Sequence, residues 1–208
     1  GETLLDGRDA ASLSIRWSHP RWMVERWLAE GGADLAEAVC RANNEPAPLT
    51  IRPAGEAPDR AALLERLQAE GATVQATRYA PDGVHLEGHR GAFPRASFCA
   101  GRWSAQDESS QLVVRLLDPG PGETIWDLCA APGGKTDYIG RLMGRQGRLL
   151  ATDVHRDKTK ALATLLSDAF YTVRVHDATA PVTEAAFDRV LLDAPCTGLL
   201  SPSDAADV

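Results

Sequence analysis

The sequence lacks long apolar runs and paired cysteines, and each absence excludes a class of protein. No apolar run approaches the roughly 20 residues that a helix needs to cross a bilayer. The four cysteines lie far apart, at positions Cys40, Cys99, Cys129 and Cys196. This spacing argues against a zinc site and a disulfide scaffold, and the five histidines add no metal-ligand pattern. We therefore expect no membrane partner and no bound metal.

A secretory signal is also missing. Residues 1–8 contain neither the basic patch nor the apolar core of a signal peptide, so the sequence predicts a cytoplasmic protein. Because the first residue is Gly rather than Met, we expect the true N-terminus to lie upstream. With 208 residues, of which 44% are hydrophobic and 25% charged, the composition is that of one or two ordinary globular domains.

Lysine is scarce, since only three of the 22 basic residues are lysine and the other nineteen are arginine. Arginine suits planar, bidentate contacts with phosphate groups, although a compositional bias of the source would give the same excess. The formal net charge is −7, whereas a nucleic-acid-binding protein usually has a basic surface. The charge balance therefore decides neither for nor against a nucleic-acid partner.

The first half of the chain predicts helices followed by a small α+β unit. Residues 1–15 show no clear period and are interpreted as a linker or as the tail of a preceding domain. Ser18 is a plausible N-cap for a helix with an apolar stripe from Trp22 to Leu28, and a second helix fits Asp34–Ala42. The α+β unit is predicted from helix-like and strand-like runs at 49–51, 59–70, 73–79 and 84–87.

The second half predicts a parallel sheet. Apolar runs alternate with helix-like stretches near 136–144 and 157–168, a pattern typical of βαβ units. The four apolar runs span 125–128, 149–151, 173–175 and 190–192. Each ends within two residues of an aspartate, namely Asp127, Asp153, Asp177 and Asp193. Ligands of open α/β sheets bind beyond the carboxyl ends of the strands, so we predict a pocket at this edge.

A loop of small residues follows the first of these strands. Ala130, Ala131, Gly133 and Gly134 would let a ligand approach the backbone closely, and the next helix offers free N–H groups to an anion. The alternative is a phosphate-binding P-loop, because Gly134-Lys-Thr136 matches the end of that motif. A P-loop requires a glycine where this chain has Cys129, so this alternative is excluded.

Two of the aspartates fit a nucleoside site. Asp153 lies 24 residues after Cys129, near the position at which nucleoside-binding folds place an acid for the ribose hydroxyls. Asp177 could accept a hydrogen bond from the exocyclic amine of an adenine. Either aspartate could instead cap the next helix. Because both are in register with the loop, we favour ligand binding.

The second informative motif is Asp193-Ala-Pro-Cys196. A single cysteine is usually a small buried residue, and Pro195 could simply shape a turn. A thiolate beside a cofactor loop could instead attack an electron-poor ring carbon, while Asp193 holds the amine of the ring.

The segment from Asp127 to Thr136 and the later Asp193-Ala-Pro-Cys196 together resemble motifs of the Sun family of RNA cytosine-C5 methyltransferases. Ser18-His-Pro-x-Trp22, Ala42-Asn-Asn44 and Gln106-Asp-x-Ser-Ser-Gln111 are similar to the bacterial RsmB type of this family. The resemblance runs from about residue 16 to residue 198. It implies a Rossmann-like, S-adenosylmethionine-dependent methyltransferase domain and a smaller N-terminal α+β (RRM-like) domain.

The resemblance also implies a division of the chain and roles for its residues. The expected parts are 1–16, a linker or the tail of a missing domain; 17–104, an RNA-binding domain; and 105–208, a methyltransferase domain that is incomplete at its C-terminus. Asp153 would contact the ribose of S-adenosylmethionine, Asp177 its adenine, and Asp193 would lie between the donor and the cytosine. The methionine end of the cofactor would be held by Cys129, Ala130, Ala131, Pro132, Gly133, Gly134 and Lys135.

The activity implied is methylation of carbon 5 of a cytosine in 16S ribosomal RNA through a covalent cysteine adduct, by a monomer. In the family the attacking thiol comes from a Thr-Cys pair beyond the Asp-Ala-Pro-Cys loop, whereas the cysteine that corresponds to Cys196 helps to release the product. This chain contains no Thr-Cys pair, so we expect the nucleophile downstream of Val208. The chain also lacks the N-terminal NusB-like helical domain that is common in the family, and whether such a domain precedes Gly1 stays open. Two alternatives stay open: a methyltransferase for a small molecule or protein, and an inactive RNA-binding or assembly factor.

Overall fold

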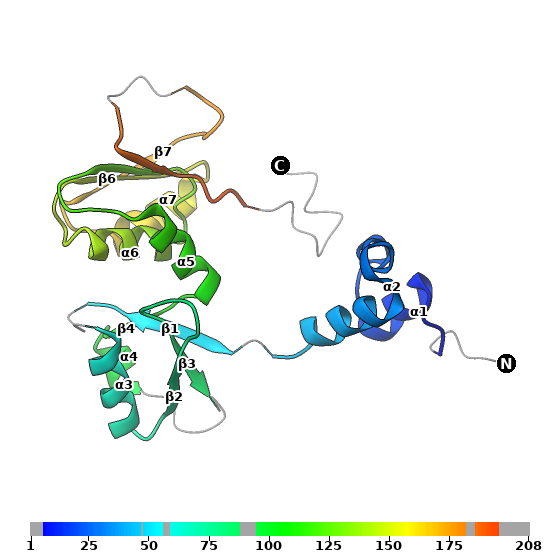
Figure 1. Ribbon diagram of the computed structural model, residues 1–208. Coiled ribbons are helices and arrows are strands. Elements are labelled where there is room, and N and C mark those ends of the chain that lie inside the picture. Colours follow the sequence, from blue (N-terminus) through cyan, green and yellow to red (C-terminus); the bar gives the residue numbers. More distant parts are fainter. Residues whose placement is uncertain (1–5, 47, 56–58, 88–94, 182–185, 196–208) are drawn as a thin grey trace. The chain divides into compact units, whose positions relative to one another are not determined.

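The computed structural model places two compact units in the chain, one ending at residue 47 and the other spanning 48–196. The structure describes residues 6–46, 48–55, 59–87, 95–181 and 186–195 (Figure 1). None of the helices in these ranges is long and apolar enough to cross a membrane. Each unit is described by itself below.

The first unit is a pair of packed helices, α1 (Ala10–Trp17) and α2 (Arg21–Asn43). The carboxylate of Asp9 begins α1 by accepting hydrogen bonds from the backbone N–H groups of Ala11 and Ser12, at 2.9 and 3.1 Å. The helices bury a small apolar core between them, made of Leu13, Val24, Ala36 and Cys40.

The structure differs from the sequence-based predictions at two places in this unit. Residues 1–16 were expected to be a linker or the tail of a preceding domain, and the structure has a capped helix from Ala10 onward. Ser18 is not an N-cap: it ends α1 in the left-handed conformation, with φ 55°, and Pro20 stands at the N-cap of α2. The two predicted helices do form. They are the two parts of α2, separated by non-helical backbone at Gly31 and Gly32.

The second unit begins with an antiparallel sheet in the order β2-β3-β1-β4. Its strands are β1 (Leu49–Pro53), β2 (Thr73–Ala76), β3 (Val84–Glu87) and β4 (Trp103–Ala105), and its helices are α3 (Arg60–Ala69) and α4 (Arg95–Cys99). Asp59 caps α3 by accepting from the N–H of Ala62 at 2.9 Å. The core of this part consists of Ile51, Leu63, Leu67, Val84 and Trp103.

Helix α5 (Glu108–Leu117) leads into a parallel sheet in the order β7-β6-β5-β8. The strands are β5 (Thr124–Asp127), β6 (Arg148–Asp153), β7 (Tyr171–Val175) and β8 (Arg189–Leu191). The intervening helices α6 (Gly134–Leu142) and α7 (Arg156–Leu165) cover one face of this sheet (Figure 1). All three strand pairs are parallel, which confirms the predicted βαβ architecture.

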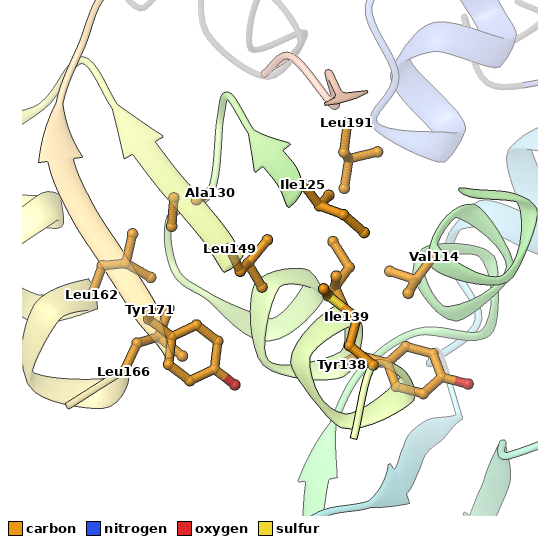
Figure 2. Packing of buried hydrophobic residues seen from close by; sticks show 12 residues of the cluster. Val114, Ile125, Ala130, Tyr138, Ile139, Leu149, Leu162, Leu166, Tyr171 and Leu191 are labelled. Atoms are coloured by element: carbon orange, nitrogen blue, oxygen red, sulfur yellow. The ribbon is translucent and has the colours of Figure 1, made fainter. Parts of the chain in front are cut away.

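The core of the parallel sheet joins its strands to the covering helices (Figure 2). Ile125, Leu149 and Leu191 come from three neighbouring strands, and Ile139 of α6 packs against the same cluster. Val114, Tyr138, Leu162, Leu166 and Tyr171 extend it. This core fixes where the strands end, and therefore where the side chains that follow them lie.

We predict that Leu149→Ala lowers the free energy of unfolding by about 2–5 kcal/mol, because it removes methylenes from a closely packed core and leaves a cavity. Leu149 is 1% exposed. Leu116→Ala is the matched control, since Leu116 is 88% exposed, and should change the stability by less than about 0.5 kcal/mol. Urea unfolding of the three proteins checks this. Equal losses in the two variants would contradict the assignment of the core.

Candidate functional site

The candidate site lies at the carboxyl edge of the parallel sheet, where the loop after β5 meets the ends of β6 and β8. The backbone N–H of Leu128 donates to Leu191 O at 3.0 Å, and that of Ala130 donates to Thr152 O at 2.8 Å. The hydroxyl of Thr152 also donates to Leu128 O at 3.0 Å. The start of the loop is thus held between the two strands that flank β5.

Gly133 allows the loop to turn into α6 while lying against α7. It stands at the N-cap of α6 with φ 108°, a backbone conformation that favours glycine. A Cβ at this position would lie 2.7 Å from Leu162 Cδ1 and 2.9 Å from Leu165 Cδ2. The neighbouring Gly134 has no such crowding, since its nearest contact would be Gln106 Nε2 at 4.0 Å. Gly133 is therefore required by the close approach of the loop to α7, and the backbone of this loop, from Cys129 to Lys135, is the cradle of the candidate site.

Asp127, the last residue of β5, lies beneath this loop and is only 1% exposed. Its Oδ2 accepts a hydrogen bond from the hydroxyl of Thr136, in the first turn of α6, at 2.8 Å. Burial raises the pKa of the Asp127 carboxyl to about 6, more than the Thr136 hydrogen bond lowers it. The charges of Asp193 and Asp153 also raise this pKa, so the structure brings the ends of β5, β6 and β8 together.

Lys135 and Asp193 connect the two sequence motifs directly. Lys135 Nζ forms an ion pair with Asp193 Oδ2, and their side chains are 24% and 44% exposed. Lys135 comes from the first turn of α6, whereas Asp193 follows β8 by two residues. The ammonium group places a cation among the aspartates at the mouth of the site. Cys196, the other residue of this motif, lies outside the described residues.

Cys129 lies at the start of the loop and is partly buried. Burial raises the pKa of its thiol, and the negative charges of three neighbouring aspartates add to the effect: Asp153, Asp127 and Asp193. A neutral thiol is a poor nucleophile, because the thiolate is the reactive form. Cys129 therefore suits a small, uncharged contact surface in the cradle.

The two aspartates predicted for the nucleoside differ in their surroundings. Asp153 ends β6, is 8% exposed and accepts from the N–H of His155 at 2.9 Å. Asp177 is exposed, and its Oδ1 accepts from the N–H and hydroxyl of Thr179, at 2.9 and 2.7 Å, which lowers its pKa. The structure brings Asp153 to the loop, whereas Asp177 follows β7, one strand further away.

Sequence reasoning overlooked two groups that shape the site. Thr136 was quoted only as part of the loop motif, although its hydroxyl is the partner of buried Asp127. Arg52, in the antiparallel sheet, donates to the backbone oxygen of Gly134 at 2.9 Å. The position of Thr136 within the loop motif could have indicated its role. Nothing in the pattern around Arg52 indicates the second.

Comparisons with known proteins place this geometry in a class. A methyltransferase homolog protein from Pyrococcus horikoshii superposes with a TM-score of 0.67 at 27% identity, covering 80% of this chain and 53% of that one. A family model for a ferredoxin-like domain of RsmF/B-like methyltransferases matches residues 19–91. The fold is thus that of a methyltransferase with a Rossmann-like domain and a preceding ferredoxin-like domain, which confirms the predicted fold class.

A second family model, described as 16S rRNA methyltransferase RsmB/F, matches residues 114–208. The chain is also 38% identical over 194 residues to the probable ribosomal RNA small subunit methyltransferase B of Bacillus subtilis (strain 168), covering 89% of this chain and 43% of the relative. Its identity to the ribosomal RNA small subunit methyltransferase B of Cronobacter sakazakii is 36%, over 92% of this chain and 44% of the relative.

The chain belongs to the RsmB/F family of 16S rRNA methyltransferases, within the Sun family. This confirms the resemblance noted in the sequence. S-adenosylmethionine, the cofactor predicted from the sequence, is the methyl donor of this family. The chain spans less than half the length of the curated relatives named here.

The raised pKa of Asp127 predicts how stability depends on pH. The ordinary pKa of this carboxyl is 3.8, and in the folded protein it is about 6. The folded state binds the proton more tightly, so the resulting stabilisation is full below pH 3.8 and is lost as the pH rises through about 6. A shift of about two units corresponds to on the order of 3 kcal/mol.

Asp127→Asn tests this dependence, since the amide can still accept from Thr136 but carries no charge. The variant should gain stability relative to the wild type between about pH 5 and about pH 8. Urea unfolding at both pH values measures the change. Asp157→Asn, at a side chain that is 96% exposed, is the control and should show no such gain. A constant difference between Asp127→Asn and wild type across this range would contradict the assignment.

Proposed function

We propose that this chain is the cofactor-binding and RNA-docking part of an enzyme that methylates carbon 5 of a cytosine in 16S ribosomal RNA. The observation that carries the proposal is the ion pair between Lys135 and Asp193, because it joins the cofactor loop to the Asp-Ala-Pro-Cys motif. The relatives named as ribosomal RNA small subunit methyltransferases support the RNA substrate. A methyltransferase for a small molecule would need the cofactor loop but not the second motif.

The cradle fits the proposed cofactor. The backbone of the loop from Cys129 to Lys135 would hold the methionine end, since α6 begins in this loop and the N-terminus of a helix offers N–H groups to an anion. Asp153 would accept hydrogen bonds from the ribose hydroxyls at the end of β6. Asp177 would accept from the adenine amine through Oδ2, because both of its hydrogen bonds to Thr179 use Oδ1.

In the proposed reaction the bound cofactor supplies an electrophilic methyl group. A cysteine thiolate adds to carbon 6 of the cytosine, forming a C–S bond and making carbon 5 electron-rich enough to take the methyl. A base then removes the proton from carbon 5, and the C–S bond breaks to release the thiolate. Asp193 would hold the exocyclic amine of the base, and the ammonium group of Lys135 would keep the Asp193 carboxylate oriented.

Cys196 would act in the release step by this proposal. The attacking thiol would come from a Thr-Cys pair, which the 208 residues do not contain. The raised pKa of Cys129 agrees with this division of roles, because a thiol that stays protonated does not compete as the nucleophile.

The part of the chain proposed to dock RNA is 17–104, and 105–208 is the proposed methyltransferase domain. The match of residues 19–91 to a ferredoxin-like domain of the same family supports the first assignment. All twelve basic residues between 1 and 105 are arginines, which offer bidentate contacts to phosphate groups. We propose a monomer, since one chain contains both motifs.

Asp153→Ala should weaken binding of S-adenosylhomocysteine, the demethylated form of the donor, by about 1–3 kcal/mol, because ribose hydroxyls would lose their acceptor. Calorimetry with the purified chain measures this. Asp157→Ala is the matched control, since Asp157 lies in the first turn of α7, the helix that follows β6, and pairs only with Lys160 among the described residues. If Asp153→Ala binds S-adenosylhomocysteine as tightly as the wild type does, Asp153 does not contact the ribose.

Cys196→Ala should trap the reaction in the enzyme that includes the Thr-Cys pair. The adduct would form and break down slowly, so protein–RNA conjugates should accumulate on denaturing gels while 5-methylcytosine falls. If Cys196 were the nucleophile, the variant would form neither conjugate nor product. Wild-type turnover in the variant would leave Cys196 as a residue that only shapes its loop. Absence of methyl transfer in the unmutated enzyme would favour an inactive assembly factor.

A further inference from the structure

Arg52 is a fully buried arginine in β1, an inner strand of the antiparallel sheet. A buried charge is costly unless its donors are satisfied, so its partners indicate why the residue is retained. On its own side of the unit, Nε donates to Gln106 Oε1 at 2.5 Å and Nη1 donates to Pro53 O at 3.1 Å. These contacts hold the guanidinium in one orientation.

The remaining nitrogen of Arg52 reaches the methyltransferase part of the unit. Nη2 donates to Gly134 O at 2.9 Å and to Asp137 Oδ2 at 3.0 Å. The guanidinium carbon also lies 4.6 Å from the centre of the Tyr138 ring. All three partners belong to the first turns of α6, the helix that starts in the cofactor loop.

The Gln106-Asp-x-Ser-Ser-Gln111 motif holds Gln106, the partner of Arg52, in place. Gln111, which is fully buried, donates through Nε2 to Gln106 O at 2.9 Å. Asp107 caps α5 by accepting from the N–H of Ser109 at 3.0 Å. The motif therefore fixes Gln106, and Gln106 fixes Arg52.

We propose that Arg52 is a positioning residue for the cofactor loop, so that the N-terminal sheet sets the affinity of the methyltransferase part for its donor. The Gly133 backbone has a conformation that most residues avoid. The planar fork of Arg52 holds Gly134 O and Asp137 together at the point where the loop becomes helix. This inference rests on the proposed function, since it takes the loop to be the S-adenosylmethionine site.

A second bridge in the same unit provides a matched comparison. Arg115 Nε donates to the Tyr138 hydroxyl at 2.8 Å, and its Nη2 forms an ion pair with Asp82. Its guanidinium carbon lies 5.6 Å from the same Tyr138 ring. Arg115 thus binds α6 as Arg52 does, but its partners Tyr138 and Asp82 both lie outside the cofactor loop. A comparison of the two arginines therefore distinguishes an effect on the cofactor loop from the general effect of joining the two sheets.

The test compares Arg52→Lys with Arg115→Lys in the full chain. Each change keeps the positive charge and removes the planar fork. Calorimetry measures the Kd for S-adenosylhomocysteine at a temperature at which circular dichroism shows both variants folded. Hydrogen exchange of the amides from Gly133 to Asp137 reports on the loop itself, which a loss of overall stability alone would not single out.

Arg52→Lys should weaken binding at least tenfold and speed exchange in the loop, whereas Arg115→Lys should stay within twofold of wild type. Asp137→Asn, which removes the negative charge that faces Arg52 but keeps an oxygen acceptor, should show a smaller loss in the same direction. An Arg52→Lys affinity within twofold of wild type, or equal losses in the two lysine variants, would overturn the inference. If wild type binds RNA but not S-adenosylhomocysteine, the cofactor site itself fails and the inference with it.

Discussion

Parallel pairing of β5 with β6 and β8 is the constraint on which the site depends. Parallel strands end at one edge of a sheet, so residues that follow different strands meet there although they are far apart in the sequence. Asp127, Asp153 and Asp193 reach this edge from three strands, and Lys135 joins them from α6. The apolar core beneath holds the strands in register. The packing of the core thus determines where the site side chains lie, because it determines where each strand ends.

The charges at this edge of the sheet bear on which ligand the candidate site can bind. Three aspartates share a small volume with one lysine, and the most buried of them, Asp127, has a pKa of about 6. Such a surplus of negative charge suits a donor whose reactive sulfur is positively charged. Burial, with the same negative charges adding to it, raises the pKa of the Cys129 thiol and keeps it neutral. By our proposal, one charge distribution thus favours the cofactor and keeps a neighbouring thiol from acting as a nucleophile.

The sequence predicted the parts of the fold that follow from local patterns. Strands β5 to β8 and the loop at Gly133 were visible because apolar runs and glycines report directly on burial and backbone conformation. Strand β4, three residues long, and α1 were missed, since short or weakly periodic segments depend on their partners. Arg52 was missed for a related reason: a strand pattern says which face is buried, not which distant carbonyl a long side chain will reach.

Strand β8 also has a consequence for how the site is assembled. Thr124 and Asp188, which begin the β5–β8 pairing, are 64 residues apart, and their hydrogen bonds at 2.7 and 2.9 Å close a loop that contains β6 and β7. Closing such a long loop costs entropy, so this pairing is expected to form late in folding. The ion pair between Lys135 and Asp193 therefore depends on this pairing, and reversible release of β8 would separate the two side chains again.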